Sequence, residues 1–195
     1  MKIFFIFFSY FLGSLPTGYI IFYISEKKDI RLFGSHSTGA TNLFRLKGWK
    51  YALPVLLVDI VKGFLPVFLA LKLFPNVRLA LICAFFAVFG HCFPVYLKFK
   101  GGKGVATTIG VYAALMYTSL LLSLIVFLMI VAVTRYVSLG SLLSVLSFPF
   151  FVFLLQGENG IIFLGLVIFV LIFFRHWSNI RRLINHDEKK LGAKI

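Results

Sequence analysis

Long apolar runs alternate with short polar segments along the whole chain. An α-helix needs about 17–25 apolar residues to cross a bilayer, and no backbone polar group can remain unpaired in hydrocarbon. The runs therefore predict membrane-spanning helices, and the chain is predicted to be an all-α, polytopic membrane helical bundle. The runs that reach or approach this length cover residues 3–24, 51–74, 78–97, 139–155 and 160–175.

Two regions decide the number of crossings. The stretch 104–134 is too long for one span and short for two, and the polar residues 117–119 interrupt it. A pair of short or kinked helices there gives seven crossings, and a single helix gives six. Residues 3–24 are apolar on both sides of Pro16, which also disfavours a signal-peptide cleavage site, so they are interpreted as one uncleaved helix.

Positive charges favour seven crossings, because short loops rich in Lys and Arg stay in the cytoplasm. The chain has 20 Lys and Arg but only 6 Asp and Glu. Most of the cations lie in residues 27–50 and 98–103, at Arg135 and in residues 175–194. These segments share one side only if about seven helices place the N-terminus outside and the C-terminus in the cytoplasm. That topology is predicted.

Composition excludes other classes of protein. Hydrophobic residues make up 61% of the chain and charged residues 13%, whereas a soluble domain is about 45–50% apolar and about 25% charged. This excludes a disordered chain and, despite the net charge of +14, a soluble nucleic-acid binder. Cys83 and Cys92 have neither a CxxC nor a zinc-type spacing, so no metal site is predicted. Residues 1–195 are predicted to form a single integral membrane domain.

The first of four polar segments covers residues 34–42 and is followed by Arg45. Its glycines let the backbone turn so that several N–H groups converge, its hydroxyl groups donate from side chains, and the guanidinium adds positive charge. This combination suits a phosphate group. A polar loop with helix-capping residues explains the same pattern equally well. The segment lacks GxxxxGK[ST], so it is not a nucleotide P-loop.

The second polar segment contains Gly101-Gly102-Lys103-Gly104 where an apolar run begins. The N–H groups of a helix N-terminus beside an ammonium group form an anion site. Nearby lysines also fit a simple cytoplasmic loop. A lysine enclosed by glycines, however, is not explained by topology alone.

The third and fourth polar segments cover residues 135–141 and 175–182, and all four segments are expected at the cytoplasmic ends of helices. An interfacial amphipathic helix explains the arginines of the fourth segment. It does not explain His176 and Asn179, which are three residues apart and would share one face of a helix. Both side chains are predicted to point at a bound polar group.

Three ionisable residues lie in apolar surroundings. Asp59 and Lys62 are three residues apart within a predicted span. Each charge in mid-bilayer costs about 2.5–3.5 kcal/mol even on the lenient scale, so the two are expected to pair or to face the bundle interior in a structural role. His91 is interpreted as a hydrogen-bonded core histidine rather than as a catalyst.

Together, GSHSTGATNLFR, GHCFPVYLKFKGGKGVAT, RYVSLGSL and RHWSNIRRL closely resemble the motifs of the bacterial acyl-phosphate:glycerol-3-phosphate acyltransferases, the PlsY family. The resemblance implies a multi-pass enzyme of the bacterial inner membrane, with its active site at the cytoplasmic face. It would transfer a fatty acyl group from acyl phosphate to the 1-hydroxyl of glycerol 3-phosphate in phospholipid biosynthesis, giving lysophosphatidic acid and phosphate. The family's first motif usually reads GSxNxGATN, and Ser37 stands here in place of Asn, which leaves the geometry of that contact open.

The chemistry of such a transfer requires no cofactor, because acyl phosphate is a mixed anhydride with a good leaving group. Positioning of two bound substrates can contribute roughly 7–11 kcal/mol. The His-x4-Asp pair of another acyltransferase family follows none of the four histidines. The general base is therefore either His176 or a phosphate oxygen of the substrate, and the substrate is favoured because the sequence offers this histidine no carboxylate.

The prediction assigns roles to the four segments. Lys103 and Arg45 bind the phosphate of one or both substrates. Ser141, His176 and Asn179 orient glycerol 3-phosphate. The further substrate-binding residues are Gly34, Ser35, Ser37, Gly39, Thr41, Asn42, Gly101 and Gly102.

Acyl phosphate, glycerol 3-phosphate and membrane lipids are the expected partners, and nucleic acid is not. A membrane transporter for a phosphorylated or anionic metabolite is the alternative function, since cationic loops and half-helix N-termini also suit translocation. The lack of an evident internal repeat and the clustering of polar residues on one face count against it. A structural lipid-binding protein would leave the Gly-Gly-Lys-Gly turn unexplained. The sequence does not give the oligomeric state and is compatible with a monomer.

Overall fold

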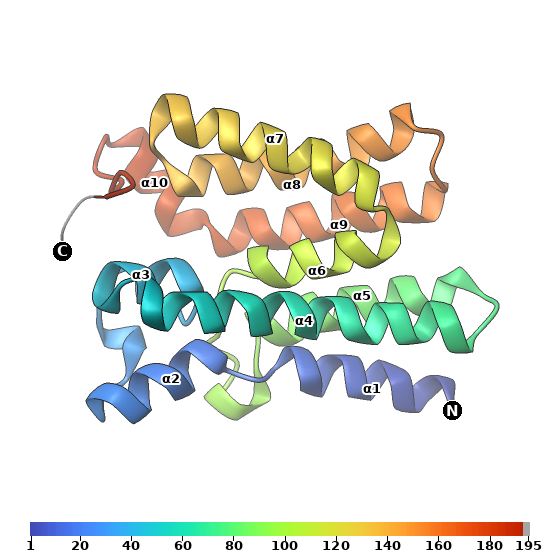
Figure 1. Ribbon diagram of the computed structural model, residues 1–195, viewed down its shortest axis with the longest axis horizontal. Coiled ribbons are helices and arrows are strands. Elements are labelled where there is room, and N and C mark those ends of the chain that lie inside the picture. The colour runs from blue at the N-terminus through green and yellow to red at the C-terminus, as the bar shows by residue number, and fades with distance from the viewer. Residues whose placement is uncertain (193–195) are drawn as a thin grey trace. The chain divides into compact units, whose positions relative to one another are not determined.

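The structure is a computed structural model that describes residues 1–192, and within that range it contains helices and no strands (Figure 1). This confirms the all-α class. The described residues form two compact units, Met1–Val111 and a second that begins at Tyr112. The division falls inside helix α6 (Val105–Leu115).

The first unit is built around three helices that pack against one another: α1 (Lys2–Gly13), α4 (Trp49–Leu73) and α5 (Val77–Cys92). The packing of α1 on α5 depends on small residues. Cβ atoms added at Gly13 or Gly90 would collide with backbone atoms of the other helix, so the two backbones approach as closely as in other membrane helix pairs. The shorter elements of this unit are α2 (Thr17–Glu26), η1 (Ile30–Leu32), α3 (Ala40–Lys47) and η2 (Val95–Leu97), the η elements being 3₁₀ helices.

The first apolar run, predicted as one helix over residues 3–24, is divided into two helices that together form one candidate membrane span, Lys2–Glu26. α1 ends at Gly13 and α2 begins at Thr17, with Pro16 as the residue before it. Proline has no N–H to donate and its ring clashes with the preceding turn, so it interrupts a helix. The break leaves the Leu15 carbonyl available to the ammonium group of Lys62, which donates to it over 2.8 Å.

Asp59 and Lys62 form the pair that the sequence predicts. Both lie in α4, and Lys62 Nζ is 2.8 Å from Asp59 Oδ1. Each side chain is only 2% exposed. Burial of either charge alone would be strongly unfavourable, so the pairing explains how both can lie inside an apolar unit.

The second unit contains α7 (Tyr117–Thr134), α8 (Val137–Leu154), α9 (Asn159–Arg175) and α10 (Trp177–Ile184). α8 packs against both α7 and α9, and the ring of Phe148 in α8 stacks on Tyr112. The stretch 104–134 is therefore two helices, α6 and α7, separated at Met116 as the seven-crossing interpretation requires. α9 and α10 meet at His176 with a bend of 64°.

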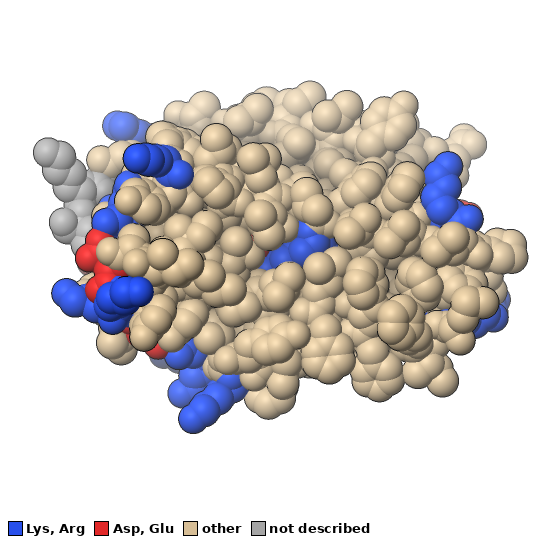
Figure 2. Space-filling view, turned by 60° about the horizontal axis from the view of Figure 1, so that its bottom comes forward, with Lys and Arg blue, Asp and Glu red and all other residues tan. Residues whose placement is uncertain are grey.

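The helices of both units suit a membrane. Within residues 1–192, five segments are long and apolar enough to cross, with the α9–α10 pair as a sixth, whereas α6 is shorter. Seven crossings and the sidedness of the termini remain predictions. Large apolar side chains such as Phe4, Val133 and Phe163 are 67–84% exposed. Figure 2 shows that most of the surface in view belongs to uncharged residues. A surface of this kind is adapted to lipid.

Candidate active site

The side chain of Asn42 holds the first polar loop in shape. Its Oδ1 accepts from Ser35 N at 2.8 Å, and its Nδ2 donates to the carbonyls of Phe33 at 3.1 Å and Ser37 at 2.8 Å. Asn42 is only 1% exposed. It was predicted to bind substrate, but in the structure its side-chain amide is occupied in organising the loop.

The loop leads into the N-terminus of α3. Gly39 is the residue before the helix, and its N–H donates to Ser37 Oγ at 3.3 Å. The first N–H groups of a helix have no partner inside the helix, and its dipole favours an anion at that end. Thr41 in this first turn is exposed, and Arg45 in the next turn is half-buried. This end of α3 can therefore attract a phosphate group.

The loop is turned by residues with left-handed backbone angles. Gly34 has a φ of 61° and His36 a φ of 55°. The His36 ring is exposed, and its Nδ1–H donates to the Arg31 carbonyl at 2.9 Å. Ser35, between these two residues, is half-buried, whereas Ser37 is 8% exposed. Of the two predicted serine donors, Ser35 is the more accessible.

Gly101 and Gly102 anchor the lysine turn to the end of α5. Gly101 N donates to Cys92 O at 3.2 Å, and Gly102 N donates to His91 O at 3.1 Å. A Cβ on Gly101 would collide with Pro94 and the His91 carbonyl, and one on Gly102 would collide with the His91 ring. Both glycines were predicted to bind substrate, but their N–H groups are bonded to the protein. Their small size is what lets the turn lie against α5.

Lys103 follows this anchored pair and is separated from the start of α6 by Gly104. It is half-buried, and Gly104 after it has a φ of 89°, a backbone angle that glycine adopts easily. α6 begins at Val105, so Lys103 lies two residues before an apolar helix. The anion site predicted at this place in the sequence stays a prediction.

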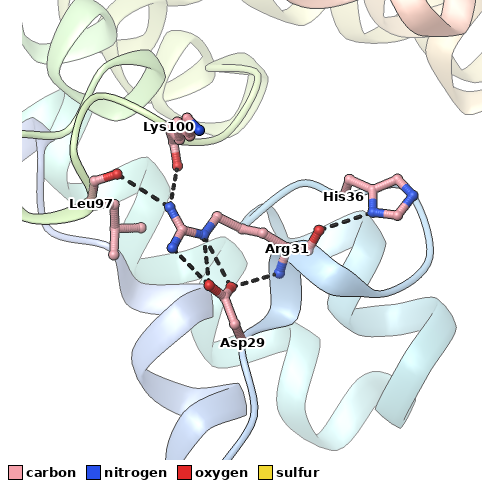
Figure 3. A network of polar contacts seen from close by, with 5 residues as sticks. All are labelled: Asp29, Arg31, His36, Leu97 and Lys100. Atoms are coloured by element: carbon pink, nitrogen blue, oxygen red, sulfur yellow. Dashed lines mark hydrogen bonds and ion pairs between the residues drawn. The ribbon is translucent and has the colours of Figure 1, made fainter.

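Arg31 links the two loops, as Figure 3 shows. Its guanidinium binds both carboxylate oxygens of Asp29, with Nη2 2.7 Å from Oδ2. Nη1 donates to the carbonyls of Leu97 at 3.2 Å and Lys100 at 3.5 Å. Hydrogen bonding from Arg31 keeps the pKa of Asp29 below its ordinary value although partial burial opposes the shift. The clamp could not be predicted from the sequence, because nothing in the local pattern pairs residue 31 with a loop nearly seventy positions later.

The second unit contains a polar cluster around Glu188, which was not predicted from the sequence. The carboxylate accepts from Ser138 Oγ at 2.8 Å, Asn179 Nδ2 at 2.7 Å and Arg182 Nε at 2.8 Å. Burial raises the pKa of Glu188, but the hydrogen bonds from Asn179, Arg182 and Ser138 outweigh it and leave the pKa below the ordinary value. Glu188 thus ties the third polar segment to the fourth within this unit. Its position in a charged tail gave no sequence signal.

His176 and Asn179 do not share the face of one continuous helix, which corrects the expectation from their spacing. His176 is the bend residue between α9 and α10, and its Nδ1–H donates to the Ile172 carbonyl at 2.9 Å. Both residues are buried. Since Nδ1 donates, Nε2 is the acceptor nitrogen of the neutral ring.

Ser141 lies in the first part of α8, where its Oγ donates to the Val137 carbonyl at 2.8 Å. It is 5% exposed. A hydroxyl bonded in this way to its own helix can still accept a hydrogen bond. Among the described residues, no group of three His, Cys, Asp or Glu side chains is arranged to hold a metal ion.

Comparison with known proteins identifies the family. The sequence matches the family described as glycerol-3-phosphate acyltransferase over residues 3–186. The glycerol-3-phosphate acyltransferase of Maridesulfovibrio salexigens is 44% identical over 98% of this chain and 98% of its own. That of Endomicrobium trichonymphae is 41% identical over 98% of this chain and 96% of its own.

Solved structures support the same family. The chain is similar to PlsY, an integral membrane glycerol 3-phosphate acyltransferase, in its glycerol 3-phosphate form, with a TM-score of 0.94 and 38% identity over 98% of this chain and 96% of the other. The lysophosphatidic acid form of that enzyme gives a TM-score of 0.91 over 98% and 95%. The polar segments described above are thus parts of an acyltransferase, and the chain belongs to the glycerol-3-phosphate acyltransferase family.

Proposed function

We propose that this acyltransferase uses acyl phosphate as donor and the 1-hydroxyl of glycerol 3-phosphate as acceptor, giving lysophosphatidic acid and phosphate. The observation that carries the proposal is the clamp at Arg31. It joins the loop that opens α3 to the turn that holds Lys103. Two anion-attracting segments of the first unit are thereby held together, as a reaction between two phosphate-bearing substrates requires.

The transfer is a direct displacement. The hydroxyl oxygen of glycerol 3-phosphate attacks the acyl carbon, and the bond from that carbon to the phosphate oxygen breaks. The hydroxyl proton passes to the base and the phosphate leaves. Lys103 and Arg45 bind substrate phosphate and stabilise the developing negative charge. The Ser35 to Asn42 loop cradles the departing phosphate.

Residues of the second unit orient glycerol 3-phosphate in this proposal. Asn179 Oδ1 is buried and accepts no hydrogen bond among the described residues, so a substrate hydroxyl would satisfy it. Ser141 Oγ donates within α8 and still offers an acceptor. The base is either His176, through Nε2, or a phosphate oxygen of the substrate, and we favour the substrate.

The proposed location is the inner membrane of a bacterium, with the chemistry at the cytoplasmic face. At about 0.8 kcal/mol per methylene, moving a fifteen-carbon tail fully into water would cost on the order of 12 kcal/mol. The acyl chain therefore stays in the apolar region while only its head group reaches the polar segments. A membrane enzyme can use this donor without extracting it.

Purified protein incubated with palmitoyl phosphate and glycerol 3-phosphate tests the proposal. We expect stoichiometric release of inorganic phosphate and formation of lysophosphatidic acid, measured colorimetrically and by mass spectrometry. Palmitoyl-CoA is the matched donor control and should give little product. Turnover with palmitoyl-CoA but none with palmitoyl phosphate would overturn the choice of donor. Uptake of glycerol 3-phosphate into proteoliposomes without any product would instead favour a transporter.

A further inference from the structure

Three ionisable side chains that the proposed reaction does not use meet inside the first unit. Asp59 Oδ1 lies 2.8 Å from Lys62 Nζ and 3.8 Å from His91 Nδ1. Their side chains are 2%, 2% and 6% exposed. Ionisable groups at this depth are expensive to maintain and commonly mark function in membrane proteins.

The cluster lies beside the Ser35 to Asn42 loop. It lines a small polar pocket together with Thr38 of that loop. The Thr38 carbonyl packs so tightly on Gly18 of α2 that a Cβ there would collide with it. The buried Ser14 Oγ, which also lines the pocket, has no hydrogen-bond partner among the described residues. The pocket is therefore polar on several sides rather than an isolated ion pair in hydrocarbon.

The cluster also contacts the lysine turn, through His91. The His91 carbonyl accepts from Gly102 N at 3.1 Å. The His91 ring occupies the space into which a side chain on Gly102 would project. A change in the position of this ring therefore displaces Gly102, and Lys103 is the next residue.

We propose that Asp59 and Lys62 are positioning residues, which fix the His91 ring and through it the turn that presents Lys103 to a substrate phosphate. The proposal rests on the role assigned above to Lys103. Lys62 is held at the helix break by the Leu15 carbonyl and in turn holds the Asp59 carboxylate. The carboxylate faces His91, so the break between α1 and α2 is connected to the lysine turn.

A purely structural ion pair is the competing explanation, and a double substitution separates the two. Asp59→Leu combined with Lys62→Met removes both charges and leaves apolar groups of similar size. Replacement of a buried ion pair in this way is often neutral or stabilising. If the pair is only structural, the double variant should therefore behave like the wild type. If the pair positions His91, the double variant should fold but position the lysine turn less well, because leucine cannot orient the His91 ring.

The experiment measures folding, exchange and kinetics on the purified full-length chain. We expect the double variant to unfold near the wild-type temperature. Without substrate, its Gly101 and Gly102 amides should exchange with deuterium at least about fivefold faster. Its KM for glycerol 3-phosphate or palmitoyl phosphate should rise at least about fivefold, with a smaller change in kcat. Lys72→Gln removes a charge from the last turn of α4 and should leave the unfolding temperature, the amide exchange and the kinetics unchanged.

Wild-type exchange and wild-type KM in a folded double variant would overturn the proposal. If the double variant does not fold, Asp59→Asn is the second test, because asparagine keeps the shape and an acceptor for Lys62. This variant should show the same faster exchange. Wild-type exchange in it would also overturn the proposal. Loss of folding in both variants would count against a positioning role, because a structural role would then explain both results. A wild-type protein without turnover would refute the proposed function, while the exchange comparison would still decide whether the pair controls the turn.

Discussion

Lys103 and Arg45 differ from most of the chain's cations in their surroundings. Both are half-buried; Lys103 lies two residues before the start of α6, and Arg45 lies in the last turn of α3. Lys189 and Lys190 in the tail are exposed. A cation near a helix N-terminus adds to the attraction of the helix dipole for an anion, and this argument applies to Lys103.

Lys103→Ala should therefore impair the reaction strongly. A hydrogen bond from a charged group is worth about 1.5–3 kcal/mol, so kcat/KM should fall at least about tenfold. Arg45→Ala should act in the same direction. Steady-state kinetics with palmitoyl phosphate measure the effect, and Lys190→Ala is the control that should change little. Intact turnover in folded Lys103→Ala, Arg45→Ala and Asn179→Ala variants would remove the basis for this site assignment.

His176 distinguishes the two candidate bases. Its Nδ1–H is bonded to the Ile172 carbonyl, so glutamine at this position can keep one donor while losing the basic nitrogen. If a substrate phosphate is the base, His176→Gln should retain measurable activity with an unchanged shape of the pH profile. Loss of activity together with loss of the basic titration limb would identify His176 as the base.

Glu188 should make stability depend on acidity. The pKa of this carboxyl is lowered in the folded protein, so its ionised form stabilises the fold above its ordinary pKa of 4.5. That contribution is lost as the pH falls through the lower folded-state pKa. Thermal unfolding between neutral pH and pH 3.5 should show a decline that Glu188→Gln flattens. Asp187→Asn, at the exposed neighbouring position, should keep the decline, and an equal slope in both variants would contradict the assignment.

At the scale of elements, the lengths of the apolar runs and the break between α6 and α7 could be predicted from the sequence, whereas the breaks at Pro16 and His176 could not. Each long run became a helix because lipid leaves the backbone no other way to bond. The breaks at Pro16 and His176 depend on which side chains meet the freed carbonyls, and Lys62 comes from a helix nearly fifty residues later. Arg31 and Glu188 were missed for the same reason, since their partners are set by tertiary contacts.

Cysteine labelling tests the topology on which the seven crossings depend. In a chain without the two buried cysteines, Cys83 and Cys92, single cysteines at Lys100 and Gln156 should react from opposite sides of the membrane. Both positions are exposed, and Lys100 should be cytoplasmic. Labelling of both from one side would mean that α6 and α7 make a single crossing, and the gathering of all four polar segments at one face would be wrong.

At the scale of the whole molecule, the family and the helical class were predictable because they depend on composition and on motifs contiguous in sequence. The four motifs contain residues that the structure places at loop and helix ends. Asn42, Gly101 and Gly102 form hydrogen bonds that shape the loops, and substrate binding by Lys103 and Arg45 stays a prediction. A motif thus marks a functional segment without telling which of its residues touch the ligand.

The spacing of Asp59 and Lys62 has a consequence for biosynthesis. The two residues lie one turn apart on the same helix, so α4 brings its own counter-ion when it leaves the ribosome and enters the bilayer. The segment can insert as a nearly neutral unit, before any other helix is present to compensate either charge. Assembly with α1 and α2 then only has to supply the Leu15 carbonyl to an ammonium group that is already neutralised.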